Sequence, residues 1–249
     1  MKKLLIFCLL IPFVQQVCAM EDTLQIQAET DYVAGNYKDA VKNYELLLQK
    51  GESADLYYNL GNAYFKSGEN SRAILNYERA LLLNPGFTDA HYNLRIAQRK
   101  IVDKIDELPE LFLVRWYKSL ISAFSADQWG WISIGFFLLM LISIGFFIYS
   151  SNVFMKKTGF TTSIVSLLIF VFTLMFAFKQ TERFEQRREA IIMSPSVTVK
   201  GSPDESGTSL FVIHEGLKVN IKEKLGQWYN IRLQDGNEGW ISMQDAEII

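Results

Sequence analysis

Two long uncharged runs constrain this chain of 249 residues more than any other feature. They occupy residues 129–149 and 158–178, and Lys157 and Lys179 bound the second run. A helix of about 20 apolar residues is long enough to cross a hydrocarbon core of about 30 Å. We therefore predict two transmembrane helices over these residues, joined by a short loop at 150–157. Neither run contains an ionisable side chain, which argues against an ion or proton pathway.

The first 19 residues have the pattern of a secretory signal peptide. A basic start precedes the apolar stretch 4–14, and Val17-Cys18-Ala19 fits the small-residue rule for cleavage before Met20. The apolar stretch is too short to span a bilayer. Both cysteines, Cys8 and Cys18, lie in this segment, so the mature chain would have no disulfide and no Cys-ligated metal.

The charges that flank the runs predict the orientation in the membrane. Lys156 and Lys157 lie in the short loop, which contains no acid, and positive short loops stay in the cytoplasm. A signal peptide independently exports the region before the first run. Basic residues after position 178 argue for the opposite orientation, but acids are interleaved with them. We predict a multi-pass protein of the cytoplasmic (inner) membrane, with both folded domains in the periplasm.

A repeat of 33 to 34 residues precedes the membrane segments. Gly35 and Ala40 recur as Gly68 and Ala73, which is the period of a stacking helix–turn–helix unit. Residues 54–87 closely resemble the tetratricopeptide repeat. The positions that carry this resemblance are Tyr57, Leu60, Gly61, Tyr64, Ala73, Tyr77, Ala80 and Pro85. We predict an array of two helical hairpins plus a capping helix over 20–106.

The resemblance implies a concave groove, lined by the first helix of each hairpin, that holds extended peptides or partner helices. The residues that would face it are Tyr58, Asn62, Phe65, Tyr92 and Arg99. An alternative is that they contact no ligand, since Tyr and Asn are common at these places in the repeat. A juxtamembrane amphipathic helix at 107–126 follows the array. It would lie along the membrane surface or pack on the array.

The C-terminal segment 190–249 follows a charged linker at 179–189 and changes to alternating apolar and polar residues, which predicts short strands. It resembles the bacterial SH3-like domain, a small all-β barrel. The segments that carry this resemblance are 197–200, 214–216, 227–229 and 239–241. Candidate contact residues are Trp228, Tyr229 and Trp240. The alternative is that the tryptophans close the barrel core, which we favour for Trp240 and leave open for Trp228.

No pattern in the sequence predicts catalysis. His91 falls at an expected packing position of the repeat and His214 before a turn, with no metal-ligand spacing beside either. Phosphate-binding loops and nucleophile elbows are absent from the sequence. The slightly negative net charge of −2 does not suggest nucleic acid as a partner. We therefore predict no enzyme activity, no catalytic, cofactor or metal residues, and no cofactor.

The whole layout predicts a mixed fold class: a helical array, a transmembrane hairpin and an SH3-like barrel. It resembles the BatE-like proteins of the Bat aerotolerance cluster of Bacteroides-type bacteria. That resemblance implies von Willebrand A-type proteins as partners and a role in oxidative or envelope stress. We predict a non-catalytic, membrane-anchored protein-interaction scaffold. The alternative is a protein that senses or tethers the cell wall, with the SH3-like domain bound to peptidoglycan.

Overall fold

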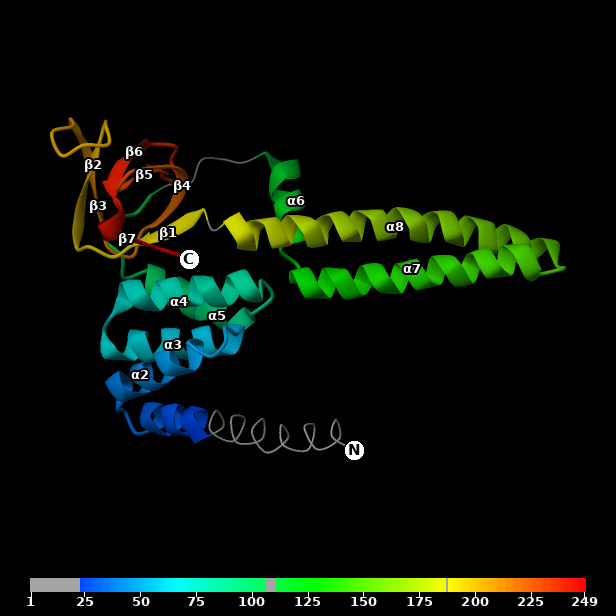
Figure 1. The fold of residues 1–249 in the computed structure, drawn as a ribbon, viewed down its shortest axis with the longest axis horizontal. Helices are drawn as coiled ribbons and strands as arrows, with labels where there is room; N and C mark the ends of the chain where they lie inside the picture. Colours follow the sequence, from blue (N-terminus) through cyan, green and yellow to red (C-terminus); the bar gives the residue numbers. More distant parts are fainter. Residues whose placement is uncertain (1–22, 106–110, 187) are drawn as a thin grey trace, which may run out of the picture. The chain divides into compact units, whose positions relative to one another are not determined.

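The computed structural model describes residues 23–105, 111–186 and 188–249. The chain divides into two compact units (Figure 1). Of the described residues, the array–sheet unit contains 23–82, 87–105 and 188–249, and the hairpin unit contains 83–86 and 111–186. The predicted signal peptide 1–19, with Cys8 and Cys18, lies outside the described residues, as does the start of the predicted juxtamembrane segment.

The array consists of a helix at 23–33 followed by α2 (Tyr37–Leu48), α3 (Ala54–Ser67), α4 (Asn70–Leu83) and α5 (Thr88–Gln98). Local signals set the bounds of α3. The Ser53 hydroxyl accepts a hydrogen bond from the Leu56 amide, and Gly68 ends the helix at a φ of 91°. The eight residues that carry the repeat pattern are all buried.

Close packing of α3 on α4 depends on Gly61. A Cβ at this position would lie 2.7 Å from Cε1 of Tyr77 and 3.3 Å from the Ala73 carbonyl oxygen. Tyr77 itself is 1% exposed. The repeat pattern therefore corresponds to a close crossing of two helices, in which the Tyr77 ring fills the space that a residue larger than Gly61 would need.

The C-terminal strands form one antiparallel sheet in the order β3-β2-β6-β5-β4-β1-β7. Its elements are β1 (Glu189–Ile192), β2 (Ser196–Lys200), β3 (Ser209–His214), β4 (Lys218–Leu225), β5 (Trp228–Arg232), β6 (Glu238–Ser242), a 3₁₀ turn (Met243–Asp245) and β7 (Ala246–Ile248). β3 and β7 are the two edges of this order, so the predicted closed SH3-like barrel is not shown. The mixed fold class is confirmed at the level of helical array, apolar helices and sheet.

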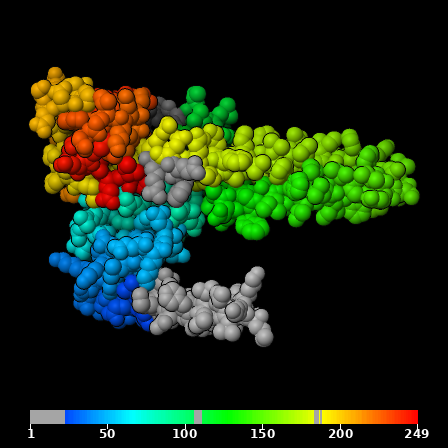
Figure 2. All heavy atoms as spheres, in the orientation of Figure 1, coloured from blue at the N-terminus to red at the C-terminus, as the bar shows by residue number. Residues whose placement is uncertain are grey.

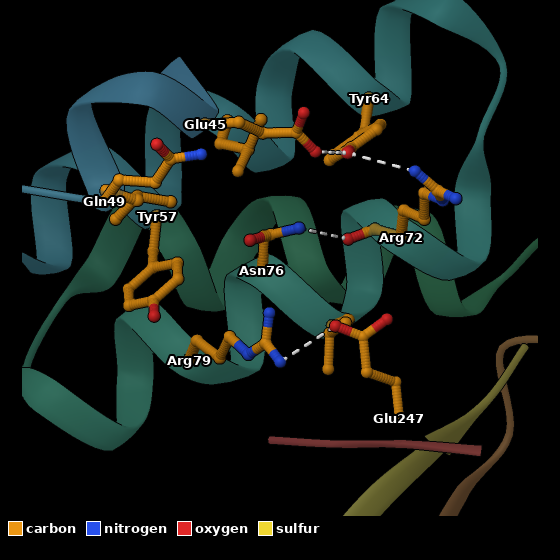
Figure 3. A pocket seen from close by; sticks show the side chains of 11 residues that line it. Glu45, Gln49, Tyr57, Tyr64, Arg72, Asn76, Arg79 and Glu247 are labelled. Atoms are coloured by element: carbon orange, nitrogen blue, oxygen red, sulfur yellow. Dashed lines mark hydrogen bonds and ion pairs between the residues drawn. The ribbon is translucent and has the colours of Figure 1, made fainter. Parts of the chain in front are cut away.

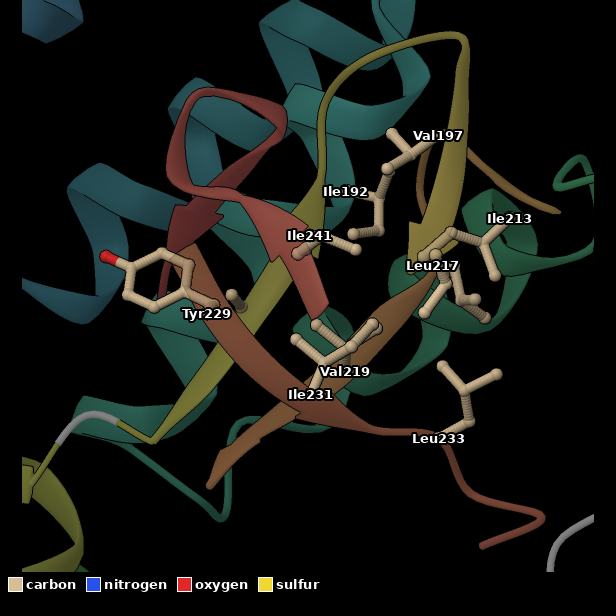
Figure 4. Close-up of a cluster of buried hydrophobic side chains, with 11 residues drawn as sticks. Ile192, Val197, Ile213, Leu217, Val219, Tyr229, Ile231, Leu233 and Ile241 are labelled. Carbon is tan, nitrogen blue, oxygen red and sulfur yellow. The ribbon is translucent and has the colours of Figure 1, made fainter. Parts of the chain in front are cut away.

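Apolar side chains from six of these strands and from two residues between strands make the core of the sheet (Figure 4). The alternation expected from the sequence places them on one face. They are Ala190, Ile192, Val197, Val199, Ile213, Leu217, Val219, Tyr229, Ile231, Leu233 and Ile241. Ile105, from the segment after α5, packs against this core.

The sheet and the array pack together as one unit, which the sequence analysis divided into two domains. Space-filling atoms of the C-terminal residues, in red, lie against the helices of the array, in cyan (Figure 2). Gly216, at a φ of 84°, makes the close approach: a Cβ there would lie 2.6 Å from Ile101 and 3.2 Å from Ile74. The Asp103 carboxylate also accepts a hydrogen bond of 2.6 Å from the backbone amide of His214.

The hairpin unit contains α6 (Phe112–Ile121), α7 (Ala126–Tyr149) and α8 (Val153–Gln186). A capping box begins α7, because Ser125 and Gln128 exchange side chain–backbone hydrogen bonds of 3.2 Å and 3.0 Å. By length and composition, Ala126–Tyr149 and Val153–Glu182 are able to cross a membrane. Much of the predicted linker 179–189 continues α8, and its last residue, Glu189, begins β1.

Candidate functional site

The predicted groove residues lie on the first helices of the repeat. Tyr58, Asn62 and Phe65 follow one another at i, i+4 and i+7 on α3 and are each half-buried. Tyr92 on α5 is 59% exposed, and Arg99, at the end of α5, is also exposed. The structure thus leaves the residues of α5 more accessible than those of α3.

Two of the α3 groove residues take part in a polar network within the array. The Asn93 amide donates to the Tyr58 hydroxyl at 3.2 Å and to Asn62 Oδ1 at 2.8 Å. The Tyr77 hydroxyl donates to the same Asn62 oxygen at 2.8 Å, and burial raises the pKa of Tyr77. Asn62 therefore joins α3, α4 and α5, so part of its hydrogen-bonding capacity is used inside the array.

The candidate contacts of the sheet occupy two different environments. Tyr229 is 8% exposed and belongs to the core, with its hydroxyl directed away from the other labelled side chains (Figure 4). Trp228 on β5 and Trp240 on β6 are half-buried and lie outside the core cluster. This placement favours the two tryptophans over Tyr229 as contact residues.

His91 was expected at a packing position of the repeat, and this expectation is wrong. It is exposed on α5, whereas Ala90, Leu94 and Ala97 provide the buried face. These three residues are spaced at i, i+4 and i+7, so they share one face of α5, and His91 lies outside that face.

A pocket that the sequence did not predict is lined by three helices of the array, α2, α3 and α4, and by β7 (Figure 3). Its volume is about 410 Å³, which is within the usual range for ligand pockets. Side chains of α2, α3, α4 and β7 line it, so array and sheet both contribute. The lining residues are Glu45, Leu48, Gln49, Tyr57, Leu60, Tyr64, Arg72, Leu75, Asn76, Arg79 and Glu247.

Two arginine–tyrosine pairs form opposite parts of the pocket wall. The Arg72 guanidinium lies 5.5 Å from the centre of the Tyr64 ring, and that of Arg79 lies 5.8 Å from the centre of the Tyr57 ring. The Tyr64 hydroxyl donates to Glu45 and accepts from Nη1 of Arg72 at 3.2 Å. Burial and the Glu45 hydrogen bond raise the pKa of Tyr64 to about 12.

The arginines and acids of the pocket balance one another in charge. Nη2 of Arg79 donates to Glu247 at 3.0 Å and to the Ile248 carbonyl oxygen at 2.7 Å. Glu45 and Arg72 meet through the Tyr64 hydroxyl. With two positive and two negative side chains, the lining has no net charge at neutral pH. The pocket is thus better suited to a neutral group than to an anion or a cation.

Asn76 is the least satisfied polar group of the pocket. It is 3% exposed, and its Nδ2 donates to the Arg72 carbonyl oxygen at 2.8 Å. Within the described part of the chain, neither Asn76 Oδ1 nor Arg79 Nε has a hydrogen-bond partner. A buried acceptor without a partner costs about 1–3 kcal/mol. The pocket therefore contains one unused acceptor and one unused donor, three residues apart on α4.

The sequence contains one signal for this pocket. Arg72, Asn76 and Arg79 recur at i, i+4 and i+7, which places three polar residues on one face of α4. Glu247 had no such signal, because it reaches the pocket only through packing of the sheet on the array. Among the described residues, no group of three or more His, Cys, Asp or Glu side chains is placed to hold a metal ion.

Comparisons with known proteins identify one repeat. Residues 54–87 match the sequence model of the tetratricopeptide repeat family. A search of curated protein sequences found no match. Two solved structures, "Crystal structure of MamA" and "Crystal structure of MamA protein", are 19% and 22% identical to this chain. Each match covers 67% of this chain. The first covers 81% of the MamA chain with a TM-score of 0.31, and the second covers 75% with a TM-score of 0.30.

Proposed function

We propose that this protein is a non-catalytic scaffold that holds partner proteins through its tetratricopeptide array. The observation that carries the proposal is the repeat at 54–87, a module that binds proteins in its family, with all eight of its pattern residues buried. Tyr92 and Arg99 are the accessible groove residues, and Tyr58, Asn62 and Phe65 form the adjoining surface. Repeats of this kind bury a common core and leave one face for a partner.

The scaffold is anchored in the cytoplasmic membrane by α7 and α8, with both folded domains in the periplasm. Large apolar side chains cover the outside of the hairpin; Leu138, Ile142 and Phe172 are 52%, 58% and 56% exposed. Such a surface is compatible with lipid and incompatible with water. The Bat aerotolerance proteins, including those with von Willebrand A-type domains, are the proposed partners, and resistance to oxidative or envelope stress is the proposed role.

A second candidate function is attachment to the cell wall through an SH3-like C-terminal domain. The half-buried Trp228 and Trp240, which lie outside the core, favour it because accessible aromatic rings give large contact areas. Co-sedimentation of the detergent-solubilised full chain with purified peptidoglycan tests this function. Binding that survives when both tryptophans are replaced by alanine would count against it.

Crosslinking in intact cells, followed by purification of the full chain, tests the scaffold function. We expect Arg99→Glu combined with Tyr92→Ala to lose specific partners that wild type retains. Lys42→Ala, an exposed change on α2, is the matched control and should retain them. Identical partners for all three proteins would contradict the groove as the binding element.

Fusion of reporter enzymes after Ile249 tests the orientation. A reporter that is active only in the cytoplasm should be silent, and one that is active only in the periplasm should be active. The reverse pattern would overturn the proposed topology without affecting the proposed role of the groove.

A further inference from the structure

We propose that α6 is a lipid-binding helix that lies in the headgroup region of an anionic bilayer. This inference rests on the proposed membrane anchoring of α7 and α8 and adds a specific lipid contact to it. The sequence left open whether this segment would lie on the membrane or pack on the array. Contacts within the hairpin unit, the exposure of one helix face and the charges beside that face favour the membrane.

Four aromatic side chains hold α6 at one end of the hairpin. The Tyr117 ring of α6 lies 6.2 Å from that of Phe176 on α8, and Trp129 of α7 lies 5.1 Å from the same ring. Phe124, in the turn after α6, contacts Trp129 at 4.9 Å. The indole Nε1 of Trp129 donates to the Ile121 carbonyl oxygen at 3.0 Å. These contacts fix the position of α6 relative to the two apolar helices.

That end of the hairpin is where a membrane boundary is expected. Trp129 lies in the first turn of α7, and Phe176 lies near the end of the apolar part of α8, six residues before Glu182. Tryptophan and tyrosine rings prefer the boundary between hydrocarbon and headgroups. A helix attached to these rings therefore lies at the level of the headgroups when the hairpin spans the bilayer.

One face of α6 remains uncovered after this packing. The Tyr117 ring contacts Phe176 of α8, and the backbone carbonyl oxygen of Ile121 accepts a hydrogen bond from the Trp129 indole of α7. Phe112, Leu113 and Trp116 are 76%, 73% and 58% exposed. Three large apolar side chains side by side are costly in water, and insertion among acyl chains removes this cost.

The polar face of the same helix matches an anionic headgroup. Arg115, Lys118 and Ser119 follow at i, i+3 and i+4, and the helix contains no acid. The long Arg115 side chain reaches the phosphates while its stem lies along the apolar surface. Each basic side chain close to an anionic membrane is worth about 1 kcal/mol, or about fivefold in partitioning. The site is thus selective for acidic phospholipids over zwitterionic ones.

Site-directed spin labelling of the full chain in lipid nanodiscs tests the proposal. Cys8 and Cys18 are replaced by alanine, and single cysteines are introduced by Leu113→Cys, Ser119→Cys and Leu138→Cys. Accessibility to molecular oxygen and to a water-soluble nickel chelate is then compared. Nanodiscs of phosphatidylcholine alone are compared with nanodiscs that also contain phosphatidylglycerol.

We expect the label at Leu113 to be reached by oxygen and protected several-fold from nickel relative to the label at Ser119. Phosphatidylglycerol should increase this protection, and Arg115→Gln should reduce the increase. The label at Leu138 reports the anchoring itself, because it lies in the middle of α7. If oxygen reaches the label at Leu138 but nickel reaches the label at Leu113, the proposal that α6 binds lipid is wrong, whereas the membrane anchoring stands.

Three other outcomes would contradict the proposal or a part of it. Nickel access at Leu138 would overturn the membrane anchoring, and the inference about α6 with it. Protection of Leu113 from both oxygen and nickel would show that protein covers the helix face, which overturns the lipid contact. Equal protection in the two lipid compositions would contradict the selectivity for acidic phospholipids.

Discussion

Nζ of Lys218 lies 2.8 Å from Oε2 of Glu78, so one ammonium group joins the start of β4 to α4. Glu189 of β1 lies 3.0 Å from the same nitrogen. Burial would lower the pKa of Lys218, but the charges of Glu78 and Glu189 and the hydrogen bonds they accept outweigh it and raise the pKa. Sheet and array thus share a largely buried cluster of one cation and two anions, whose side chains are 19%, 11% and 29% exposed for Lys218, Glu78 and Glu189.

Replacement of Lys218 by methionine should strongly destabilise this unit. The change leaves two carboxylates close together without their cation, and breaking a buried ion pair in this way costs about 3–5 kcal/mol. Lys222→Met is the matched control on the same strand, because the Lys222–Glu238 pair is exposed to solvent. Urea unfolding of each variant in detergent, monitored by intrinsic fluorescence, measures the two losses of stability. Equal midpoints for the two variants would show that the cluster does not hold the sheet on the array.

A methyl group at Gly216 should loosen the same interface. Gly216→Ala places an L side chain at a φ of 84° and a Cβ 2.6 Å from Ile101. Gly226→Ala is the control, since its φ is 57° and no atom lies within 4 Å of the added Cβ. Left-handed backbone costs about 1–2 kcal/mol in both variants, and overpacking adds about 1–3 kcal/mol in the first. Limited proteolysis should therefore cleave Gly216→Ala faster, and equal rates would contradict the close approach.

The buried tyrosines predict loss of stability at high pH. Burial is the main cause that raises the pKa of Tyr44 and of Tyr64 to about 12, from 10.0 in a model peptide. Between these values the unfolded chain loses the phenolic protons and the folded chain retains them. The stability that these groups contribute is complete below pH 10 and is lost as the pH rises towards 12.

Ultraviolet absorbance of tyrosinate and far-ultraviolet circular dichroism, recorded together, check this prediction. Ionisation of the buried tyrosines should coincide with loss of helical signal. Tyr44→Phe removes one ionising group and should move the alkaline midpoint to higher pH. Ionisation of all tyrosines near pH 10 before any helix is lost would refute it.

The sequence predicted the parts of this fold that depend on local spacing. Gly61 and Tyr77 are both pattern residues of the predicted repeat, and they pack together within one hairpin. The apolar helices follow from run length alone. Both features are short-range, and a single sequence records them directly.

Packing of the sheet on the array could not be predicted in this way. Glu78 and Lys218 are 140 residues apart, and no periodic pattern relates them. The pocket beside Asn76 depends on the same packing, because Glu247 completes its wall. The hydrogen bonds of the groove residues could not be predicted either, because Asn62 accepts from Asn93 and Tyr77 inside the array.

The hairpin should depend on a glycine at a close contact between α7 and α8. A Cβ at Gly159 of α8 would lie 2.8 Å from the Ser143 carbonyl oxygen and 3.0 Å from the Phe147 amide nitrogen of α7. Backbone atoms cannot move aside as a flexible side chain can, so Gly159→Ala must separate the helices. Small residues serve this purpose in membranes, where close backbone approach drives association.

We expect Gly159→Ala to destabilise the hairpin by about 1–3 kcal/mol. Gly145→Ala is the control within α7, because no atom lies within 4 Å of its added Cβ. Removal of a glycine from a helix interior favours helix formation by up to about 1 kcal/mol, so the control should be neutral or stabilising. Unfolding with sodium dodecyl sulfate in mixed micelles, monitored by circular dichroism, separates the two. A midpoint for Gly159→Ala at or above that of Gly145→Ala would mean that the helices do not pack at this contact.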